Sequence, residues 1–263
     1  MDSFDLTTIG ADLPAAELID RLPAEVADPF PRLVVEAPPG TGKTTLVPPL
    51  IAEHLRTTAG PDSGRIVVTQ PRRMAARAAA RRLAHLTGTR LGEDIGFTVR
   101  GESTVSARTR IEFVTTGVLL RRMLGDPELP GVAAIILDEV HERHLDTDLV
   151  FAMGRELVEL RDDLSLVVMS ATLDAKALAA HMDAQILSTE AVTHPLGISY
   201  HPHPGRAQRG HARDPAAELE VRDRVVRDRR AGPGQDPDLL VVEPLHLGDQ
   251  PSRRAQPEGV SGA

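Results

Sequence analysis

The feature that most constrains how this chain can fold is the segment Ala37–Thr44, APPGTGKT, which lies between a short apolar run and a stretch with helical spacing. Backbone N–H groups can converge on a triphosphate only where small residues let the chain wrap closely, which accounts for Gly40 and Gly42. Lys43 would reach the β- and γ-phosphates, and the Thr44 hydroxyl would bind Mg²⁺. The residues expected to bind the nucleotide, ATP, are Pro39, Gly40, Thr41, Gly42, Lys43, Thr44 and Thr45.

Short apolar runs alternate with helical patterns such as Arg72–Leu86 and Asp146–Leu160. This alternation predicts an α/β fold, a parallel sheet with helices on both faces, because the apolar runs are continuous. A glycine-rich turn without function is the weaker interpretation of Ala37–Thr44, although Ala37 replaces the usual first glycine. The expected strands are Leu33–Ala37, Ile66–Gln70, Ile111–Val114, Ala133–Leu137 and Leu164–Met169.

Two adjacent acids, Asp138 and Glu139, follow the apolar run that ends at Leu137. Open parallel sheets bind ligands at the carboxyl ends of their strands. We therefore expect Asp138 to hold Mg²⁺ through its water shell, and Glu139 to orient and deprotonate an attacking water. A solvated acidic turn is the alternative, which the phosphate-loop pattern upstream makes weaker. The nearby His141 and His144 stand three residues apart, whereas a zinc-binding pair on a helix needs four.

A basic segment begins at another expected strand end, with Arg72 and Arg73 before an alanine-rich helix. Two arginines beside a helix N-terminus suit a phosphodiester backbone, and the hydroxyls of Thr115 and Thr116 could add contacts to it. The alternative is a solvated helix face. No aromatic cluster is present for base stacking, so binding should be to the backbone and blind to base sequence.

The segment Ser170-Ala-Thr172 ends the last of these expected strands. Taken alone, it is most simply a strand-to-helix turn in which Thr172 or Asp174 caps the next helix. Its place after the Asp138-Glu139 strand favours a second interpretation, in which the Ser170 and Thr172 hydroxyls contact the loop that holds Mg²⁺.

Composition excludes several classes of protein. The chain has no cysteine, which rules out disulfides and thiolate metal sites, and its first residues lack the basic region of a secretory leader. No apolar stretch is long enough to span a membrane, so a cytoplasmic location is expected. The net charge is −8, yet residues 60–125 hold twelve Arg against five acids, whereas residues 126–190 hold fourteen acids against four bases. This asymmetry is compatible with two solvated faces or with a phosphate-binding strip beside a metal-using site.

The ordered motifs resemble those of the first RecA-like domain of superfamily 2 helicases of the DEAH type, and most closely the bacterial HrpB-type helicases. The resemblance covers roughly residues 13–200, with DEVH in place of DEAH. It implies an ATP-dependent helicase that uses Lys43, Asp138, Glu139 and His141 in catalysis, with RNA favoured over DNA as the single-stranded partner. It also implies that His141 couples the nucleotide to a second domain and that Ser170 and Thr172 link hydrolysis to strand separation. The segments that carry it are APPGTGKTT, QPRRMAARAAARRLA, LGEDIGFTVRGES, TRIEFVTTGVLLRRM, DPELPGVAAIILDEVHERHLDTDL and LVVMSATLD.

The character of the sequence changes near residue 201, where Pro, Gly, Arg and His replace the patterned segments. We expect residues 1–200 to form one domain and 201–263 an incomplete second domain or a non-native tail, with a helix over 216–230 and a strand over 238–243. Helicases of this group carry a QxxGRxGR box in their second domain, and the sequence has none. The expectation is a truncation or frameshift after about residue 205, and a chain that binds ATP but hydrolyses it poorly.

Two other functions remain open from the sequence. A P-loop phosphotransferase would need a lid of arginines and a substrate acid, against which the DEVH and SAT segments argue. An ATP-binding module without turnover would explain the missing second-domain motif. ATPase measurements with and without RNA would separate these three functions.

Overall fold

The computed structural model of the chain describes residues 3–142, 144–171 and 175–189. Within these residues the strands form a single eight-stranded sheet in the order β4-β3-β5-β2-β6-β7-β1-β8. All neighbouring strands are parallel except β4, which pairs antiparallel with β3. The strands are β1 (Arg32–Glu36), β2 (Arg65–Gln70), β3 (Ile95–Val99), β4 (Glu102–Thr104), β5 (Ile111–Thr115), β6 (Val132–Leu137), β7 (Ser165–Ser170) and β8 (Gln185–Ser188).

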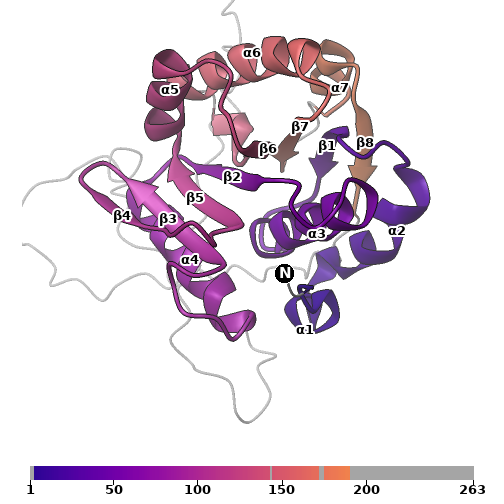
Figure 1. The fold of residues 1–263 in the computed structure, drawn as a ribbon. Helices are drawn as coiled ribbons and strands as arrows, with labels where there is room; N and C mark the ends of the chain where they lie inside the picture. Colours follow the sequence, from indigo (N-terminus) through magenta and orange to yellow (C-terminus); the bar gives the residue numbers. More distant parts are fainter. Residues whose placement is uncertain (1–2, 143, 172–174, 190–263) are drawn as a thin grey trace, which may run out of the picture. The chain divides into compact units, whose positions relative to one another are not determined.

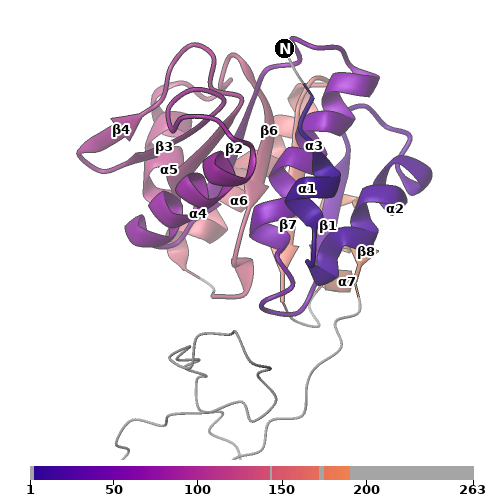
Figure 2. The ribbon, with the colours of Figure 1, turned by 90° about the horizontal axis from the view of Figure 1, so that it is seen from below.

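Helices cover both faces of this sheet, as Figures 1 and 2 show. On one side lie α1 (Leu6–Gly10), α2 (Leu18–Glu25), α3 (Lys43–Thr58) and α4 (Arg73–Leu86); on the other lie α5 (Thr116–Gly125), α6 (Leu145–Leu160) and α7 (Ala175–Met182). Short 3₁₀ turns precede α2 and α6, namely η1 (Pro14–Glu17) and η2 (Val140–Glu142). The predicted α/β class with two covered faces is confirmed.

The pleat explains why the central strands are apolar throughout. In β1, Leu33 and Val35 pack with α3 on one face, while Val34 packs with the α6 side on the other. Successive side chains of a strand point to opposite faces, so a strand that is covered twice needs apolar residues at every position. The same holds in β2, where Ile66 and Val68 face one cluster and Val67 the other.

Helix α4 shows how the alanine-rich segment folds. Ala76, Ala80 and Leu83 are buried at helical spacing and face the core, whereas Arg81 and Arg82 are exposed. The small alanines let the helix lie close to the sheet, and the arginines remain in water.

All five predicted strands are present, with ends that differ by about one residue, but β3, β4 and β8 were not predicted. Two of these lie at the sheet edges, where β4 has only three residues and β8 four, so their apolar signal is short. The antiparallel β3–β4 hairpin is also a departure from the expected all-parallel sheet. The helix and strand expected over 216–230 and 238–243, and the boundary near residue 200, lie outside the described residues.

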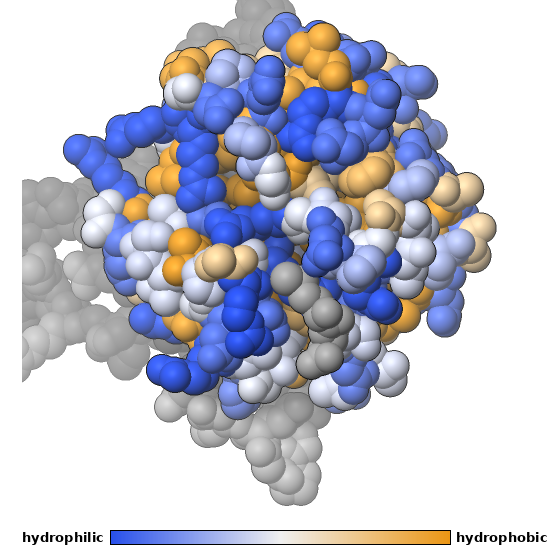
Figure 3. Space-filling view, viewed as in Figure 1, coloured by the Kyte–Doolittle hydropathy of each residue, from blue (hydrophilic) through white to orange (hydrophobic). Residues whose placement is uncertain are grey.

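On the face shown in Figure 3, hydrophilic and hydrophobic areas alternate. Among the described residues, no helix is both long enough and apolar enough to cross a membrane.

Candidate nucleotide-binding site

The predicted functional segments meet at one edge of the sheet. Strands β5, β2, β6, β7 and β1 are adjacent and parallel, so their carboxyl ends share this edge. The loop after β1 is tied to the end of β7 by the backbone N–H of Ala37, which donates to the Ser170 carbonyl at 3.1 Å. Parallel topology therefore brings together motifs that are far apart in the sequence.

The loop after β1 has the backbone that a phosphate cradle requires. Gly40 and Gly42 have φ angles of 78° and 88°, in the left-handed region that favours glycine, and Gly42 caps the start of α3. The Thr41 hydroxyl donates to the Pro38 carbonyl at 2.9 Å, which stabilises the turn. Lys43 is buried at the first turn of α3. The free N–H groups and positive end of a helix N-terminus favour an anion at this position.

The metal-binding prediction rests on Thr44 and Asp138, and the structure places their side chains in contact. The Thr44 hydroxyl donates to Asp138 Oδ2 at 2.6 Å, which joins the phosphate loop to the end of β6. Mg²⁺ prefers oxygen ligands and commonly takes one or two from the protein and the rest from phosphates and water. A hydroxyl and a carboxylate side by side are suitable ligands for Mg²⁺. An ion bound there would neutralise part of the negative charge of the phosphates.

Glu139 follows Asp138 in a backbone conformation with φ of 56°. Burial raises the pKa of its carboxyl, and the neighbouring Asp138 charge raises it further, while Lys43 and His141 partly offset both effects. His141 Nε2 lies 3.2 Å from Glu139 Oε2. A half-buried carboxyl with a raised pKa is suited to accept a proton from water, the role predicted for Glu139.

His141 has a second feature that bears on its predicted coupling role. Its Nδ1 atom is buried and has no hydrogen-bond partner among the described residues. Such an atom normally finds a partner, because an unsatisfied buried polar group is costly. The histidine thus contacts Glu139 through one ring nitrogen and leaves the other unpaired.

Two of the four predicted nucleic-acid residues line a separate hollow of about 360 Å³ at the same sheet edge. Thr115 and Thr116 line it, whereas Arg72 and Arg73 lie at the start of α4. Arg72 is 77% exposed in its side chain, 3.6 Å from Glu142, and Arg73 donates to the Arg100 carbonyl at 2.9 Å. Both arginines are on the surface. The other lining residues are Pro71, Gly117, His144, Leu145, Asp146 and Thr147.

Of the two residues predicted to link hydrolysis to strand separation, Ser170 is buried at the end of β7, and Thr172 lies outside the described residues. One residue at this edge was given no role by sequence reasoning. Gln70 was seen only as the start of the QPRR segment, yet its side-chain amide donates to Asp138 Oδ2 at 2.6 Å. The role of Gln70 could have been predicted from its position, because a polar residue at the end of a continuous apolar strand is expected to be buried and to need a hydrogen-bond partner.

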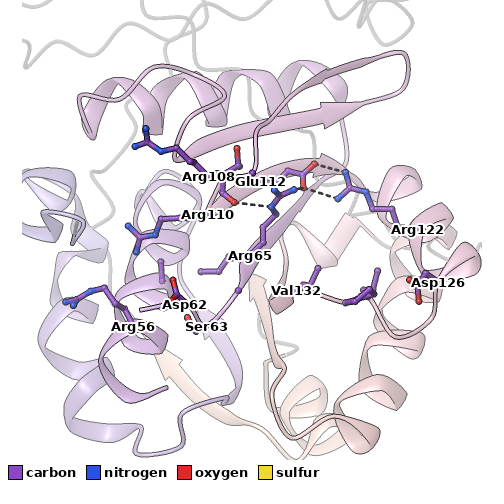
Figure 4. A pocket seen from close by; sticks show the side chains of 18 of the residues that line it. Arg56, Asp62, Ser63, Arg65, Arg108, Arg110, Glu112, Arg122, Asp126 and Val132 are labelled. Atoms are coloured by element: carbon purple, nitrogen blue, oxygen red, sulfur yellow. Dashed lines mark hydrogen bonds and ion pairs between the residues drawn. The ribbon is translucent and has the colours of Figure 1, made fainter. Parts of the chain in front are cut away.

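A larger hollow, of about 700 Å³, lies at the opposite, amino-terminal edge of β2, β5 and β6 (Figure 4). Glu112 is fully buried in its wall and accepts hydrogen bonds from Arg122, Arg65 and Thr98. Arg56 and Arg110 pair with Glu53 in the same way. These arginines neutralise buried acids of the scaffold, and none of the predicted site residues lines this hollow.

The sheet, the glycine-rich loop at its carboxyl edge and the acidic strand end define a RecA-like P-loop domain. The chain belongs to the DEAD/DEAH box helicase family, whose model matches residues 24–180. It is 40% identical over 196 residues to the ATP-dependent RNA helicase HrpB of Escherichia coli strain K12, a match that covers 74% of this chain and 24% of that protein. The crystal structure of the Escherichia coli DEAH/RHA helicase HrpB matches with a TM-score of 0.63 and 39% identity, covering 70% of this chain and 23% of that one.

These comparisons confirm the resemblance stated from the sequence motifs and the fold class. The chain spans about a quarter of the length of the relatives it matches. The roles of the individual site residues remain predictions.

Proposed function

We propose that residues 1–200 form the ATP-binding domain of an ATP-dependent RNA helicase and couple ATP hydrolysis to strand separation. The observation that best supports this is the 2.6 Å contact between Thr44 and Asp138, because it joins a phosphate loop to an acidic strand end. Glu139, the candidate base, is the very next residue. A phosphate cradle, two oxygen ligands and a base are among the parts that phosphoryl transfer to water requires.

Each part has a distinct task in this proposal. The N–H groups at the start of α3 and the Lys43 ammonium bind the β- and γ-phosphates, and Thr44 and Asp138 hold Mg²⁺. Glu139 orients a water molecule and takes its proton at the carboxylate, which its raised pKa favours. His141, Ser170 and Thr172 couple this chemistry to movement of a second domain.

The proposed partner is single-stranded nucleic acid, bound through its phosphates by Arg72 and Arg73 with help from Thr115 and Thr116. Both arginines are exposed, and the threonines line a hollow at the same edge. RNA is proposed over DNA because the matched relative is named an RNA helicase. The cytoplasmic location expected from the sequence stays a prediction.

The first test is nucleotide affinity in Lys43→Ala. Removal of one charge-assisted contact to the phosphates should cost about 1.5–3 kcal/mol, or roughly a ten- to hundredfold rise in the Kd for ATP measured by calorimetry. Lys176→Ala, an exposed lysine on α7, removes the same charge elsewhere and should leave the Kd unchanged. Equal affinities for wild type and Lys43→Ala would show that the phosphate loop has been misassigned.

A binding module without turnover is the competing function, since the sequence has no QxxGRxGR box. The ATPase rate and the ATP affinity of Glu139→Gln distinguish this function from the proposed one, because the variant removes the base and leaves the phosphate loop intact. The proposal expects any measurable ATPase rate to fall at unchanged ATP affinity. The module predicts no rate in either protein.

A further inference from the structure

Gln70 occupies the middle of the candidate site. It is the last residue of β2, which lies between β5 and β6, and its side chain is almost fully buried. On one side its backbone is in register with Thr115. On the other side Thr69 is in register with Leu137, the last residue of β6, and Asp138 directly follows that strand. Gln70 therefore lies between the proposed nucleic-acid residues and the proposed metal ligand.

The side-chain amide of Gln70 fixes the Asp138 carboxylate. Its Nε2 donates to Oδ2 at 2.6 Å, and the Glu139 N–H donates to Oδ1 at 2.9 Å. An ionised carboxylate only accepts hydrogen bonds, so the amide nitrogen must face it. The Thr44 hydroxyl donates to the same Oδ2. When Thr44 turns towards a metal ion, the bond from Gln70 still holds the carboxylate in place.

The backbone between Gln70 and the arginines has little conformational freedom. Pro71 follows Gln70, and a proline locks its own φ angle and restricts the residue before it to extended conformations. Arg72 continues this extended backbone, with φ of −123° and ψ of 140°, as the cap of α4. Its guanidinium also lies 3.6 Å from Glu142, in η2 just after Asp138 and Glu139. The QPRR segment thus contacts the acidic segment at two points.

We propose that Gln70 is a positioning residue that sets the Asp138 carboxylate for the divalent metal and links that carboxylate to nucleic acid bound at Arg72 and Arg73. This inference rests on the proposed function. In it, movement of the arginines on a phosphate backbone shifts Gln70 through Pro71 and so changes how well Asp138 binds metal. We expect the change to be an increase, and the metal–nucleotide complex then raises the affinity for nucleic acid by the same factor, since such linkage is reciprocal.

The test compares the 263-residue chain with Gln70→Met, which is similar in length but has no donor. The Kd of a fluorescent, non-hydrolysable ATP analogue is measured with and without Mg²⁺. In wild type Mg²⁺ should tighten binding, and in Gln70→Met that benefit should fall about tenfold, as expected for one charge-assisted hydrogen bond. The Kd without Mg²⁺ should stay within about twofold, because the phosphate loop is untouched.

A matched control separates positioning from folding. Thr69 is as buried as Gln70 and accepts the Asp138 backbone N–H at 3.3 Å, but does not touch its carboxylate. Thr69→Val should lower the melting temperature and leave the Mg²⁺ benefit unchanged. If Gln70→Met does not fold, Gln70→Asn keeps an amide that falls about 1.5 Å short of the carboxylate, and the same loss is expected.

The second measurement is the affinity for a labelled single-stranded oligouridine, with and without the Mg²⁺–analogue complex. Wild type should bind RNA more tightly with the complex, and Gln70→Met should lose that difference while its affinity without nucleotide is unchanged. The inference would be overturned if Mg²⁺ tightened analogue binding as much in both Gln70 variants as in wild type. It would also be overturned if the Mg²⁺–analogue complex did not tighten RNA binding in wild type, or if it still did so in Gln70→Met. Failure of wild type to bind the analogue would instead refute the proposed function itself.

Discussion

At the scale of single residues, the two glycines of the phosphate loop share a left-handed backbone but differ in their surroundings. A Cβ atom on Gly42 would lie 2.7 Å from the side chain of Leu13, whereas one on Gly40 would meet nothing within 4 Å. Leu13 is partly buried against the core and lies next to η1, so its side chain would have to shift to make room for a Cβ atom on Gly42. The loop is therefore packed on one side by the N-terminal segment and open on the other.

We predict that Gly42→Ala is more harmful than Gly40→Ala. The left-handed backbone alone should cost each variant about 1–2 kcal/mol, and the contact with Leu13 adds to this only at Gly42. Chemical denaturation would measure the difference, and nucleotide affinity should fall in parallel. Gly42→Ala should cost less stability when it is introduced into Leu13→Ala than when it is introduced into wild type, because the contact with the Leu13 side chain is then absent. Equal effects at the two glycines would contradict the packing shown by the structure.

At the scale of elements, β2 and α4 present the proposed nucleic-acid surface at their junction. Replacing Arg72 and Arg73 with Ala should weaken binding of single-stranded RNA and flatten the slope of log affinity against log salt. The flattening should be about 0.7 for each lost phosphate contact, or about 1.4 for both. Arg81→Ala with Arg82→Ala removes the same charge from the exposed face of the same helix and should leave the slope unchanged. Identical slopes in the two double variants would favour a solvated helix face.

The opposite edge of the sheet depends on Glu112, which is fully buried in β5 and joins β2, β3 and α5 through Arg65, Thr98 and Arg122. Glu112→Gln should lower the free energy of unfolding by roughly 2–3 kcal/mol. This is less than the 3–5 kcal/mol typical of a broken buried pair, because both arginines still reach water. Glu159→Gln, which breaks an exposed pair with Arg32, should cost at most about 1 kcal/mol.

Glu112 also makes the stability of the folded protein depend on pH. Burial would raise the pKa of Glu112, but hydrogen bonds from Arg122 and Thr98 and the charges of Arg122 and Arg65 outweigh it and lower the pKa below its usual 4.5. The Glu112 carboxyl therefore stays ionised in the folded protein at a pH where it already takes up a proton in the unfolded chain. The stabilisation is full above about pH 4.5 and is lost as the pH falls through the folded value. In Glu112→Gln, thermal unfolding should therefore vary less steeply with pH below 4.5 than in wild type.

At the scale of the whole molecule, the question is how much of the helicase reaction these 263 residues perform. We predict that the purified chain binds ATP, hydrolyses it slowly and does not displace a strand from a tailed duplex. In related NTPases, arginine fingers contribute about 10³–10⁵ to turnover, and the resemblance assigns them to a box that the sequence lacks. Unwinding also requires two domains that move against each other. Steady-state ATPase at saturating RNA would test this, and robust RNA-stimulated turnover would contradict it.

The sequence alone was sufficient for the α/β class, the five central strands and the phosphate loop. These features are encoded locally: a strand covered twice must be apolar at every position, and a left-handed turn around a phosphate must use glycine. The edge strands β4 and β8 escaped prediction because they have only three and four residues and gain their stability from the strands and helices beside them; β3, with five residues, was also missed.

Only the tertiary structure decided which of these residues meet. Residues 44, 70 and 138 lie in separate segments of the chain, and their convergence on one carboxylate follows from the order of β2, β6 and β1 in the sheet. The burial of Glu112 among arginines at the far edge is equally non-local. The sequence determined the chemical parts, because residue types and spacing carry them. Strand order and register determined their contacts, because these depend on packing over the whole sheet.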